Sequence, residues 1–442
     1  MNQIIVCKYG GSSTASPESL ELKRRITKDD SRRKVIILSA HGKLGDEKKD
    51  TDLLIDLART KDNSIIDRII NKARKIYSQI PRARFDEMQD DLFRRTRQEL
   101  SGPALEDSVK SFGEYMCARL SAETLGYEFV DPKDLFLVSH DFGKGQILPN
   151  SEEMIRSRLS GKKGPLIIPG FYGFTENGDT VTLSRGGSDL TGAYIAAALD
   201  ACLYENFTDT EGIFAADPKL VDKPRKIEKI TFAEIRDLAY SGFSVFHEEA
   251  MKPLGKKGIP VHVRNTFTYP SQGTLIVPDR ICSTDRPIVG VAYKESFCSL
   301  DIDFFGLNES IGSGRKILSV FEQRKIPVEY LTTGIDDISV IVNSKYFEGD
   351  FNRIDGVLSE LRDVLGEDSN IFLQQNLGSL VVAGKGLKGK RGISADIQTT
   401  LAEAGVNIRF ISQGPLERSI VYGIESSDGR KAVNVLYDKY LK

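Results

Sequence analysis

The sequence predicts an α/β protein with an open, mainly parallel sheet sandwiched by helices, followed by a region of shorter strands and helices. Before residue 285, short apolar runs alternate with longer segments in which apolar residues recur every three or four positions. Runs that are apolar throughout suit a parallel sheet, because helices cover both of its faces. After residue 285, a shorter cycle of strand, helix, strand, strand, helix occurs twice. We therefore expect a large domain over residues 1–285 and two smaller domains over residues 296–370 and residues 286–295 plus 371–442.

The expected strands of the first domain are residues 4–7, 35–38, 166–168 and 259–263. Its expected helices are residues 53–59, 109–125, 191–199 and 235–240, where the apolar spacing matches one face of a helix. Asn177 and Gly178 indicate a hairpin, since this dipeptide favours the tight turn between antiparallel strands. In the later region, residues 314–342 resemble residues 392–424 at an offset of roughly 80 residues. Such repeats leave crevices that suit a small ligand, so we interpret the region as paired sensors.

Charge and composition argue against several classes of function. The 442 residues include 61 Lys and Arg against 63 Asp and Glu, so no overall field favours nucleic acid or an anionic membrane. No apolar stretch approaches the roughly 20 residues of a membrane span, and the first residues lack the features of a signal peptide. We expect a cytoplasmic protein with no membrane and no nucleic-acid partner. The five cysteines and four histidines show no metal-ligand spacing, so we predict buried, reduced thiols and no metal held by them.

The first expected strand ends in a glycine-containing turn that comprises Lys8, Gly10, Gly11, Ser12 and Ser13. Two glycines let the backbone turn sharply and expose adjacent N–H groups, which cradle phosphate oxygens. Lys8 adds a compact positive charge for the group that is transferred. The alternative is an ordinary strand-to-helix turn with a solvated lysine.

A second strand-to-helix junction comprises Arg185, Gly186, Gly187, Ser188 and Asp189. Arg185 supplies a planar fork for a carboxylate, and Asp189 is suited to orienting Lys8 or a magnesium ion. The alternative is that Ser188 or Asp189 merely caps the helix. Capping does not explain an arginine beside two glycines.

Several further positions are ambiguous on their own. Thr208 and Asp209 follow a strand in a polar turn suited to nucleotide groups, and Lys219 is suited to a phosphate. Glu114 lies on a helix whose apolar stripe is on the other side, so it faces either water or a cleft. Thr51 is either a helix N-cap or a substrate ligand.

Taken together, the segments KYGGSS, LSAHG, TDLLIDL, SFGEYM, SRGGSDLTGAYIAAAL, FTDTEGIFAADPKLV and GIPVHVRNTF resemble those of aspartate kinases, in the same order and over nearly the whole chain. The resemblance implies an amino-acid-kinase fold followed by two ACT domains, which are βαββαβ units of the ferredoxin-like type. It also implies phosphorylation of the β-carboxylate of L-aspartate to 4-phospho-L-aspartate with ATP and Mg²⁺, the first step of lysine, threonine and methionine biosynthesis. A carboxylate with a reference pKa of about 3.9 is already a nucleophile at neutral pH, so such a site needs positioning and charge neutralisation rather than a general base.

The resemblance also carries roles to individual residues. Lys8 and Asp189 match the catalytic pair, in which Lys8 stabilises the transferred phosphoryl group. The aspartate site is matched by Ser39, Thr51, Glu114 and Arg185, with Arg185 on the α-carboxylate and Glu114 on the α-ammonium group. The ATP site is matched by Lys8, Gly10, Gly11, Ser12, Ser13, Thr208, Asp209, Phe214, Asp217 and Lys219. As departures from the family pattern, Phe214 replaces a common tyrosine, Lys219 replaces a frequent arginine, and Ser244 stands where a lysine commonly approaches ATP.

For regulation, the resemblance implies feedback inhibition by an end-product amino acid, lysine first and threonine second. The expected effector site comprises Ser313, Gly314, Val328 and Glu329. ACT domains usually pair across subunits, so a homodimer or a dimer of dimers is expected. Two other functions stay open. One is a related kinase acting on another small carboxylate or carbamate, and the other is an amino-acid sensor whose kinase domain has lost activity, which Ser244 motivates.

Overall fold

The computed structural model describes residues 3–184, 186–240, 246–281, 286–347, 349, 351–366 and 369–442. The predictions that concern Arg185, Ser244, Cys282 and Asp285 therefore lie outside the described residues. The chain divides into two compact units, the first comprising Met1–Ile213, Lys226–Phe232 and Ser244–Arg280, and the second comprising Phe214–Arg225, Ala233–Phe243 and Ile281–Lys442. The second unit thus includes two segments that precede residue 285, and the boundary predicted at that residue stays a prediction.

An eight-stranded sheet forms the core of the first unit, in the order β3-β4-β2-β1-β7-β9-β10-β8. Its strands are β1 (Ile5–Tyr9), β2 (Arg33–Leu38), β3 (Glu128–Phe129), β4 (Leu166–Pro169), β7 (Leu203–Thr208), β8 (Lys229–Thr231), β9 (Val261–Asn265) and β10 (Thr274–Val277). Among these described strands, all neighbours are parallel except β9 and β10. Nearly every residue of β1, β2 and β4 is buried, as apolar runs in a covered sheet require. The predicted α/β class with a mainly parallel sheet is confirmed.

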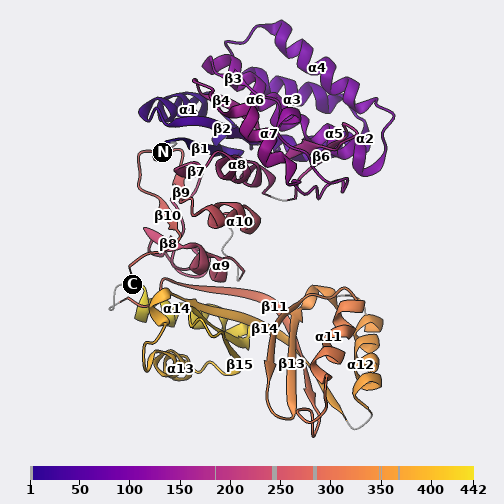
Figure 1. Cartoon of the computed structure of the whole chain (residues 1–442), viewed down its shortest axis with the longest axis vertical. Helices are drawn as coiled ribbons and strands as arrows, with labels where there is room; N and C mark the ends of the chain where they lie inside the picture. Colours follow the sequence, from indigo (N-terminus) through magenta and orange to yellow (C-terminus); the bar gives the residue numbers. More distant parts are fainter. Residues whose placement is uncertain are drawn as a thin grey trace. The chain divides into compact units, whose positions relative to one another are not determined.

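The helices of the first unit pack against the sheet and against one another (Figure 1). They are α1 (Pro17–Asp29), α2 (Asp50–Thr60), α3 (Asn63–Ile76), α4 (Arg82–Thr96), α5 (Gly102–Lys110), α6 (Phe112–Leu125), α7 (Asn150–Leu159), α8 (Gly187–Ala198) and α10 (Glu248–Lys257). Successive side chains of a strand point to opposite faces. Cys7 and Tyr9 of β1 therefore pack in the apolar cluster that includes α6, whereas Lys8 reaches Asp189 of α8 on the other face.

Two local predictions have different outcomes. The helix predicted over residues 109–125 is two helices, α5 and α6, which are divided at Ser111. The Ser111 hydroxyl donates a hydrogen bond to the Ser108 carbonyl oxygen (3.0 Å), and such local bonding competes with a regular helix. The predicted hairpin is confirmed, because β5 (Tyr172–Phe174) and β6 (Thr180–Thr182) are antiparallel and Gly178 in their loop has a φ of 86°.

The functional region is positioned by the ends of the parallel strands. Tyr9 of β1 pairs with Leu38 of β2 and with Phe207 of β7, and Thr208 of β7 pairs with Asn265 of β9. The chain therefore leaves β1, β2 and β7 at the same edge of the sheet. Open α/β sheets bind ligands outside this carboxyl edge.

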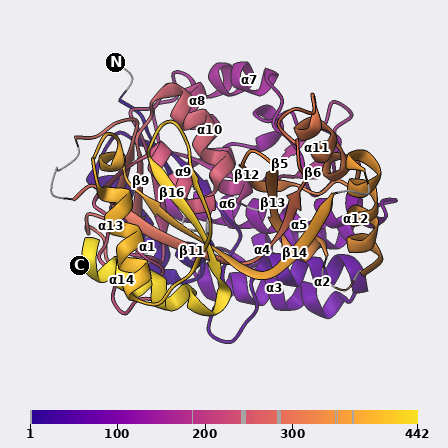
Figure 2. The same cartoon turned by 90° about the horizontal axis from the view of Figure 1, so that it is seen from below.

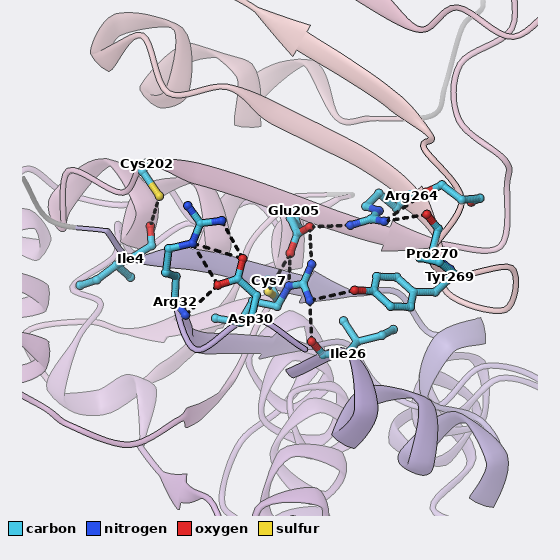
Figure 3. Close-up of polar contacts among 12 residues, drawn as sticks. Ile4, Cys7, Ile26, Asp30, Arg32, Cys202, Glu205, Arg264, Tyr269 and Pro270 are labelled. Atoms are coloured by element: carbon cyan, nitrogen blue, oxygen red, sulfur yellow. Dashed lines mark hydrogen bonds and ion pairs between the residues drawn. The ribbon is translucent and has the colours of Figure 1, made fainter. Parts of the chain in front are cut away.

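A buried ion cluster joins β2, β7 and β9. Glu205 of β7 accepts hydrogen bonds from Arg33 of β2 (2.6 and 3.0 Å) and from Arg264 of β9 (3.1 Å). Both guanidinium groups also lie over the ring of Tyr269, and Figure 3 shows this ring with Glu205 and Arg264. Burial raises the pKa of the Glu205 carboxyl, but the two arginines outweigh burial and hold the pKa below its usual value. The cluster ties three strands together inside the sheet.

A six-stranded antiparallel sheet forms the second unit, in the order β12-β13-β11-β14-β16-β15. In chain order its elements are β11 (Gly290–Asp303), α11 (Ser313–Gln323), β12 (Val328–Thr333), β13 (Asp337–Asn343) and α12 (Phe351–Leu365), then β14 (Asn370–Ala383), α13 (Ile393–Glu403), β15 (Ile408–Gln413), β16 (Ser419–Glu425) and α14 (Gly429–Tyr440). α9 (Phe232–Tyr240) belongs to this unit except for its first residue. The predicted cycle thus occurs twice. α11 packs on α12 and α13 packs on α14, while β11 and β14 pair along both halves (Figure 2).

The described thiols and helices bear on two further predictions. Cys7, Cys117, Cys202 and Cys298 are all free thiols. Three of them are buried as predicted, but Cys202 is exposed because it lies in the turn before β7, so the prediction is wrong for this residue. Within the ranges that the structure describes, no helix has both the length and the apolar character that a membrane span requires.

Candidate active site

A cavity of about 550 Å³ lies at the carboxyl edge of the sheet in the first unit. It brings together predicted site residues from distant parts of the sequence: Lys8, Gly10, Gly11, Ser12, Ser39, Thr51, Glu114, Asp189, Thr208 and Asp209. Its other lining residues are Ala40, His41, Gly42, Lys43, Lys49, Phe171, Gly186, Gly187 and Ser188. The phosphate-type turn and the residues predicted to bind an amino acid therefore share one cavity.

Lys8 and Asp189 form the charged centre of this cavity. The Lys8 ammonium lies 2.6 Å from Oδ1 of Asp189, and the two side chains are 12% and 13% exposed. Lys8 is the fourth residue of β1, and Asp189 lies in the first turn of α8. Asp189 therefore fixes a flexible lysine so that its charge is presented to the cavity.

The glycine turn after β1 has a different physical basis from the predicted one. Gly11 has a φ of −58°, so the turn does not need the left-handed conformation that glycine permits. Close packing requires glycine at position 42, because a Cβ there would lie 2.7 Å from the Gly11 carbonyl carbon, while a Cβ on Gly11 would lie 3.1 Å from the Ala40 carbonyl oxygen. Within the described residues, the N–H groups of Gly11 and Ser12 have no acceptor, whereas the N–H of Gly10 donates to Phe207 (3.0 Å). Two adjacent donors are thus available for phosphate oxygens.

The two serines of this turn differ. Ser12 lines the cavity, whereas Ser13 is fully buried and its hydroxyl lies 2.7 Å from the hydroxyl of Thr266. Ser13 therefore ties the turn to the segment after β9, and its hydroxyl group does not reach the cavity. The sequence prediction did not distinguish between the two residues.

α8 begins at the cavity with two glycines. Gly186 precedes the helix with a φ of 77°, and a Cβ there would also collide with the His247 ring. Both observations restrict this position to glycine. The first residues of α8, including Asp189, line the cavity, and helix N-termini are common binding sites for phosphate.

Glu114 lies at the cavity from the α6 side. It is 5% exposed, which excludes the alternative of a surface side chain. Its Oε1 accepts the N–H of Ala40 (3.1 Å), while Oε2 has no hydrogen-bond partner in the described part of the chain. Burial raises the pKa of this carboxyl to about 8. Oε2 of Glu114 is therefore available to pair with a cation of a bound ligand.

A buried polar network beneath the cavity was missed by sequence reasoning. His41 Nδ1 donates to Asp50 (2.7 Å), and Lys72 of α3 donates to the other Asp50 oxygen (2.9 Å). Burial alone lowers the pKa of His41, but the charges of Cys117 and Asp50 outweigh it and raise the pKa to about 9. The available signal was the helical spacing, which places Lys72 on the same stripe as the buried Ile65, Ile69 and Ile76 of α3.

Phe171 is a second lining residue that the sequence did not single out. It has a φ of 77°, a conformation that bulky residues rarely adopt. Its N–H donates to the Thr191 hydroxyl (3.0 Å), and its carbonyl accepts the N–H of Leu183 (2.7 Å). These bonds hold the strained residue so that it forms a wall of the cavity.

Three predicted nucleotide residues do not line the cavity. Phe214, Asp217 and Lys219 belong to the second compact unit. Asp217 accepts the N–H of Lys219 (2.9 Å), and the Lys219 carbonyl accepts a hydrogen bond from Arg430 of α14 (2.8 Å). Their assignment to ATP stays a prediction.

The predicted effector residues lie at the two ends of α11. Ser313 begins this helix, and its hydroxyl donates to the Ser310 carbonyl (2.8 Å). Val328 begins the strand that follows the opposite end. The 11 residues of α11 span about 16 Å at 1.5 Å per residue, so one copy of the chain does not bring Ser313 next to Val328. Oε2 of Glu329 is buried and has no hydrogen-bond partner among the described residues.

The cavity has oxygen ligands of the kind that magnesium prefers. Asp189 and Asp209 both line it, and Mg²⁺ is typically held by one or two carboxylates together with substrate phosphates. Oδ1 of Asp189 is buried and makes no well-directed hydrogen bond, although the Lys8 ammonium lies close to it. This donor set fits a nucleotide-bound Mg²⁺. In the described ranges, no three or more His, Cys, Asp or Glu residues cluster as a metal site of the protein alone.

Comparison with known proteins agrees with the fold. The amino acid kinase family model matches residues 3–265, and an ACT domain model matches residues 380–440. Aspartokinase 3 of Bacillus subtilis (strain 168) is 36% identical over 450 residues, which cover 98% of this chain and 98% of that protein. The crystal structure of Clostridium acetobutylicum aspartate kinase is 32% identical and has a TM-score of 0.83, covering 99% of this chain and 100% of its own. The structure of E. coli aspartokinase III in complex with aspartate and ADP is 24% identical, with a TM-score of 0.79 over 100% of both chains, and supports the fold.

The fold and the cavity define the class, an amino-acid-kinase domain joined to an ACT regulatory region. Relatives that match over nearly the whole length are aspartate kinases. The chain belongs to the aspartokinase family.

Proposed function

We propose that the protein transfers the γ-phosphoryl group of ATP to the β-carboxylate of L-aspartate, forming 4-phospho-L-aspartate and ADP. One observation carries this proposal. Lys8, Asp189 and the glycine turn line the same cavity as Glu114, which offers a carboxylate oxygen without a partner in the described chain. Membership of the aspartokinase family supports the same reaction.

The chemistry requires positioning and charge neutralisation. The β-carboxylate is ionised at neutral pH, since its reference pKa is about 3.9, and its oxygen attacks the γ-phosphorus as the bond to the β–γ bridging oxygen breaks. Lys8, held by Asp189, neutralises charge on the transferred group. The N–H groups of Gly11 and Ser12 bind phosphate oxygens. Asp189 and Asp209 would hold Mg²⁺ together with the nucleotide, and the ion would neutralise further phosphate charge.

The amino-acid end of the cavity favours a free α-amino acid. Glu114 pairs with the α-ammonium group, and the hydroxyls of Ser39 and Thr51 hydrogen-bond the rest of the acceptor. Arg185 is assigned to the α-carboxylate from its sequence position alone. An N-acylated acceptor has no ammonium group, so it leaves Glu114 without a partner.

The direct test measures ADP formation by the purified protein with Mg-ATP and aspartate, glutamate or N-acetylglutamate. We expect turnover with aspartate and loss of turnover in Lys8→Met. Preferential turnover of glutamate or N-acetylglutamate would favour a related kinase. Absence of turnover with every acceptor at millimolar concentration would favour an amino-acid sensor.

We also propose feedback inhibition by lysine, with threonine as the second candidate, in a homodimer or a dimer of dimers. Ser313 with Gly314 and Val328 with Glu329 are separated by α11 within one chain, so an effector that touches both pairs binds between two copies. The buried Oε2 of Glu329 suits a cationic side chain. Inhibition by lysine should weaken in Glu329→Ala, and unchanged inhibition by both lysine and threonine would contradict this placement. Light scattering gives the number of copies.

A further inference from the structure

Two cations at the active-site cavity have no role in the reaction described above. Lys43 and Lys49 belong to the loop between β2 and α2, and both side chains are exposed and line the cavity. Within the part of the chain that the structure describes, neither ammonium group has an ion-pair or hydrogen-bond partner. Lys48 lies between them in the sequence but differs, because it pairs with Asp56 (2.9 Å) and does not line the cavity. The loop thus presents two uncompensated positive charges to the cavity.

A buried lysine holds both ends of this loop. Lys72 of α3 is fully buried, and its ammonium donates to the carbonyl of Gly42 (2.5 Å), the carbonyl of Lys48 (3.0 Å) and the carboxylate of Asp50 (2.9 Å). Asp50 also accepts a hydrogen bond from His41 (2.7 Å). A buried ammonium is costly unless all its donors are satisfied, so the backbone of residues 42 and 48 cannot move away from Lys72 without a large penalty. The loop that carries the two exposed lysines is therefore pre-organised.

The charges around the cavity indicate which ligand the loop serves. Lys8 is already paired with Asp189, and the carboxyl groups of Glu114 and Asp209 also line the cavity. The loop follows Ser39 and precedes Thr51 in the sequence, and both are proposed ligands of the acceptor. A dicarboxylate amino acid carries a net negative charge, so lysines on this side favour its approach.

We infer that Lys43 and Lys49 attract and bind the carboxylates of the acidic amino-acid acceptor, on a loop that Lys72 and Asp50 hold in place. The inference rests on the proposed function and assigns the loop to acceptor affinity rather than to phosphoryl transfer. Exposed charge pairs contribute modestly, up to about fivefold in affinity for each lysine. Lys72 is a positioning residue in this arrangement, because it acts through the loop.

The test compares the full-length variant Lys43→Gln/Lys49→Gln with Lys48→Gln, a matched control on the same loop. We expect the KM for aspartate to rise about tenfold in the double variant, with kcat and the KM for ATP unchanged and with a weaker salt dependence of the aspartate KM. Lys48→Gln should match the wild type, and Lys43→Arg/Lys49→Arg should restore the aspartate KM. An unchanged aspartate KM, an equal rise in Lys48→Gln, or a rise confined to the KM for ATP would overturn the inference.

The anchor is tested separately by Lys72→Met/Asp50→Asn, which removes the charges of Lys72 and Asp50 together. We expect a higher aspartate KM in this variant and no further rise when Lys43→Gln/Lys49→Gln is added, since both changes act through one loop. If the rises in the aspartate KM from the two double substitutions were fully additive, the anchoring role would be overturned. If Lys72→Met/Asp50→Asn does not fold, the comparison of the surface lysines decides. If the wild type forms no ADP with aspartate, this inference fails together with the proposed function. An active wild type with an unchanged aspartate KM in the surface double variant overturns this inference alone.

Discussion

Replacing Glu114 by glutamine separates the charge of this side chain from its shape. The carboxyl is buried, and burial raises its pKa to about 8. At pH 7 a group with this pKa is ionised in only about one molecule in ten, and at pH 6 in about one in a hundred. An amino-acid ammonium group pairs with the ionised form, so the apparent KM for aspartate is raised about tenfold at pH 7 and approaches the KM of the neutral side chain at pH 6. The aspartate KM of the wild type should therefore fall as the pH rises and level off above the pKa.

Glutamine keeps the hydrogen bond to the Ala40 N–H but has no titratable group. In Glu114→Gln we expect the aspartate KM to be independent of pH between 6 and 8. At pH 8, where about half of the wild-type groups are ionised, it should exceed the wild-type value by about fifteenfold, because a charge-assisted hydrogen bond contributes about 2 kcal/mol, a factor of about thirty. The effect should appear in the KM for aspartate and leave the KM for ATP nearly unchanged.

The assay is the initial rate of ADP formation at pH 6, 7 and 8 as a function of aspartate concentration. Glu123→Gln is the matched control, because Glu123 lies on the same helix but pairs with Arg84 (2.8 Å) outside the cavity. Two results would refute the reasoning. One is the same pH profile in Glu114→Gln as in the wild type, and the other is a flattened profile in Glu123→Gln.

Three other predictions concern the turn, the sheet and the buried histidine. Ser12→Ala should raise the KM for ATP severalfold, whereas Ser13→Ala should leave it unchanged and lower the free energy of unfolding by about 1 kcal/mol, since its hydroxyl bonds Thr266. Glu205→Gln leaves two buried guanidinium groups without a counter-charge, so the free energy of unfolding should fall by about 3–5 kcal/mol, and an unchanged urea midpoint would contradict this. The pKa of His41 is raised from 6.5 to about 9, so the stability it contributes is complete below pH 6.5 and lost as the pH rises through 9. In His41→Gln, urea unfolding at pH 6.5 and pH 9 should show a smaller difference than in the wild type.

The position of Lys8 and the glycine turn at the cavity was predictable because the signals for it are local in the sequence. Lys8 and the glycines follow one apolar run within a few residues, and glycines after a strand favour a turn with exposed N–H groups. The period of two in a strand also separates Lys8 from its apolar neighbours. The close contacts of this turn were not predictable, because Gly11 packs against Ala40 and Gly42, which follow a different strand.

Glu114 shows a limit of prediction from local sequence patterns. Its position in the helix identifies the face on which the side chain lies, but the sequence does not show whether that face is open to water or to a cleft. The N–H of Ala40 comes from the loop after β2 and is what places Glu114 at the cavity. The resemblance to aspartate kinases supplied this residue, and the fold supplies the physical reason for its unusual proton affinity.

Lys72 shows that a polar residue at a core position of a helix is itself informative, although a search for apolar residues alone passes over it. It lies at helical spacing from Ile65, Ile69 and Ile76, so a lysine occupies a position that the pattern assigns to the core. A charge on a buried stripe is stable only when a full set of acceptors meets it, and here those acceptors are the two ends of the loop that carries Lys43 and Lys49, together with Asp50. The polar residue that breaks the stripe therefore marks where a distant backbone segment must pack. In this protein that segment is the one that brings two lysines to the cavity.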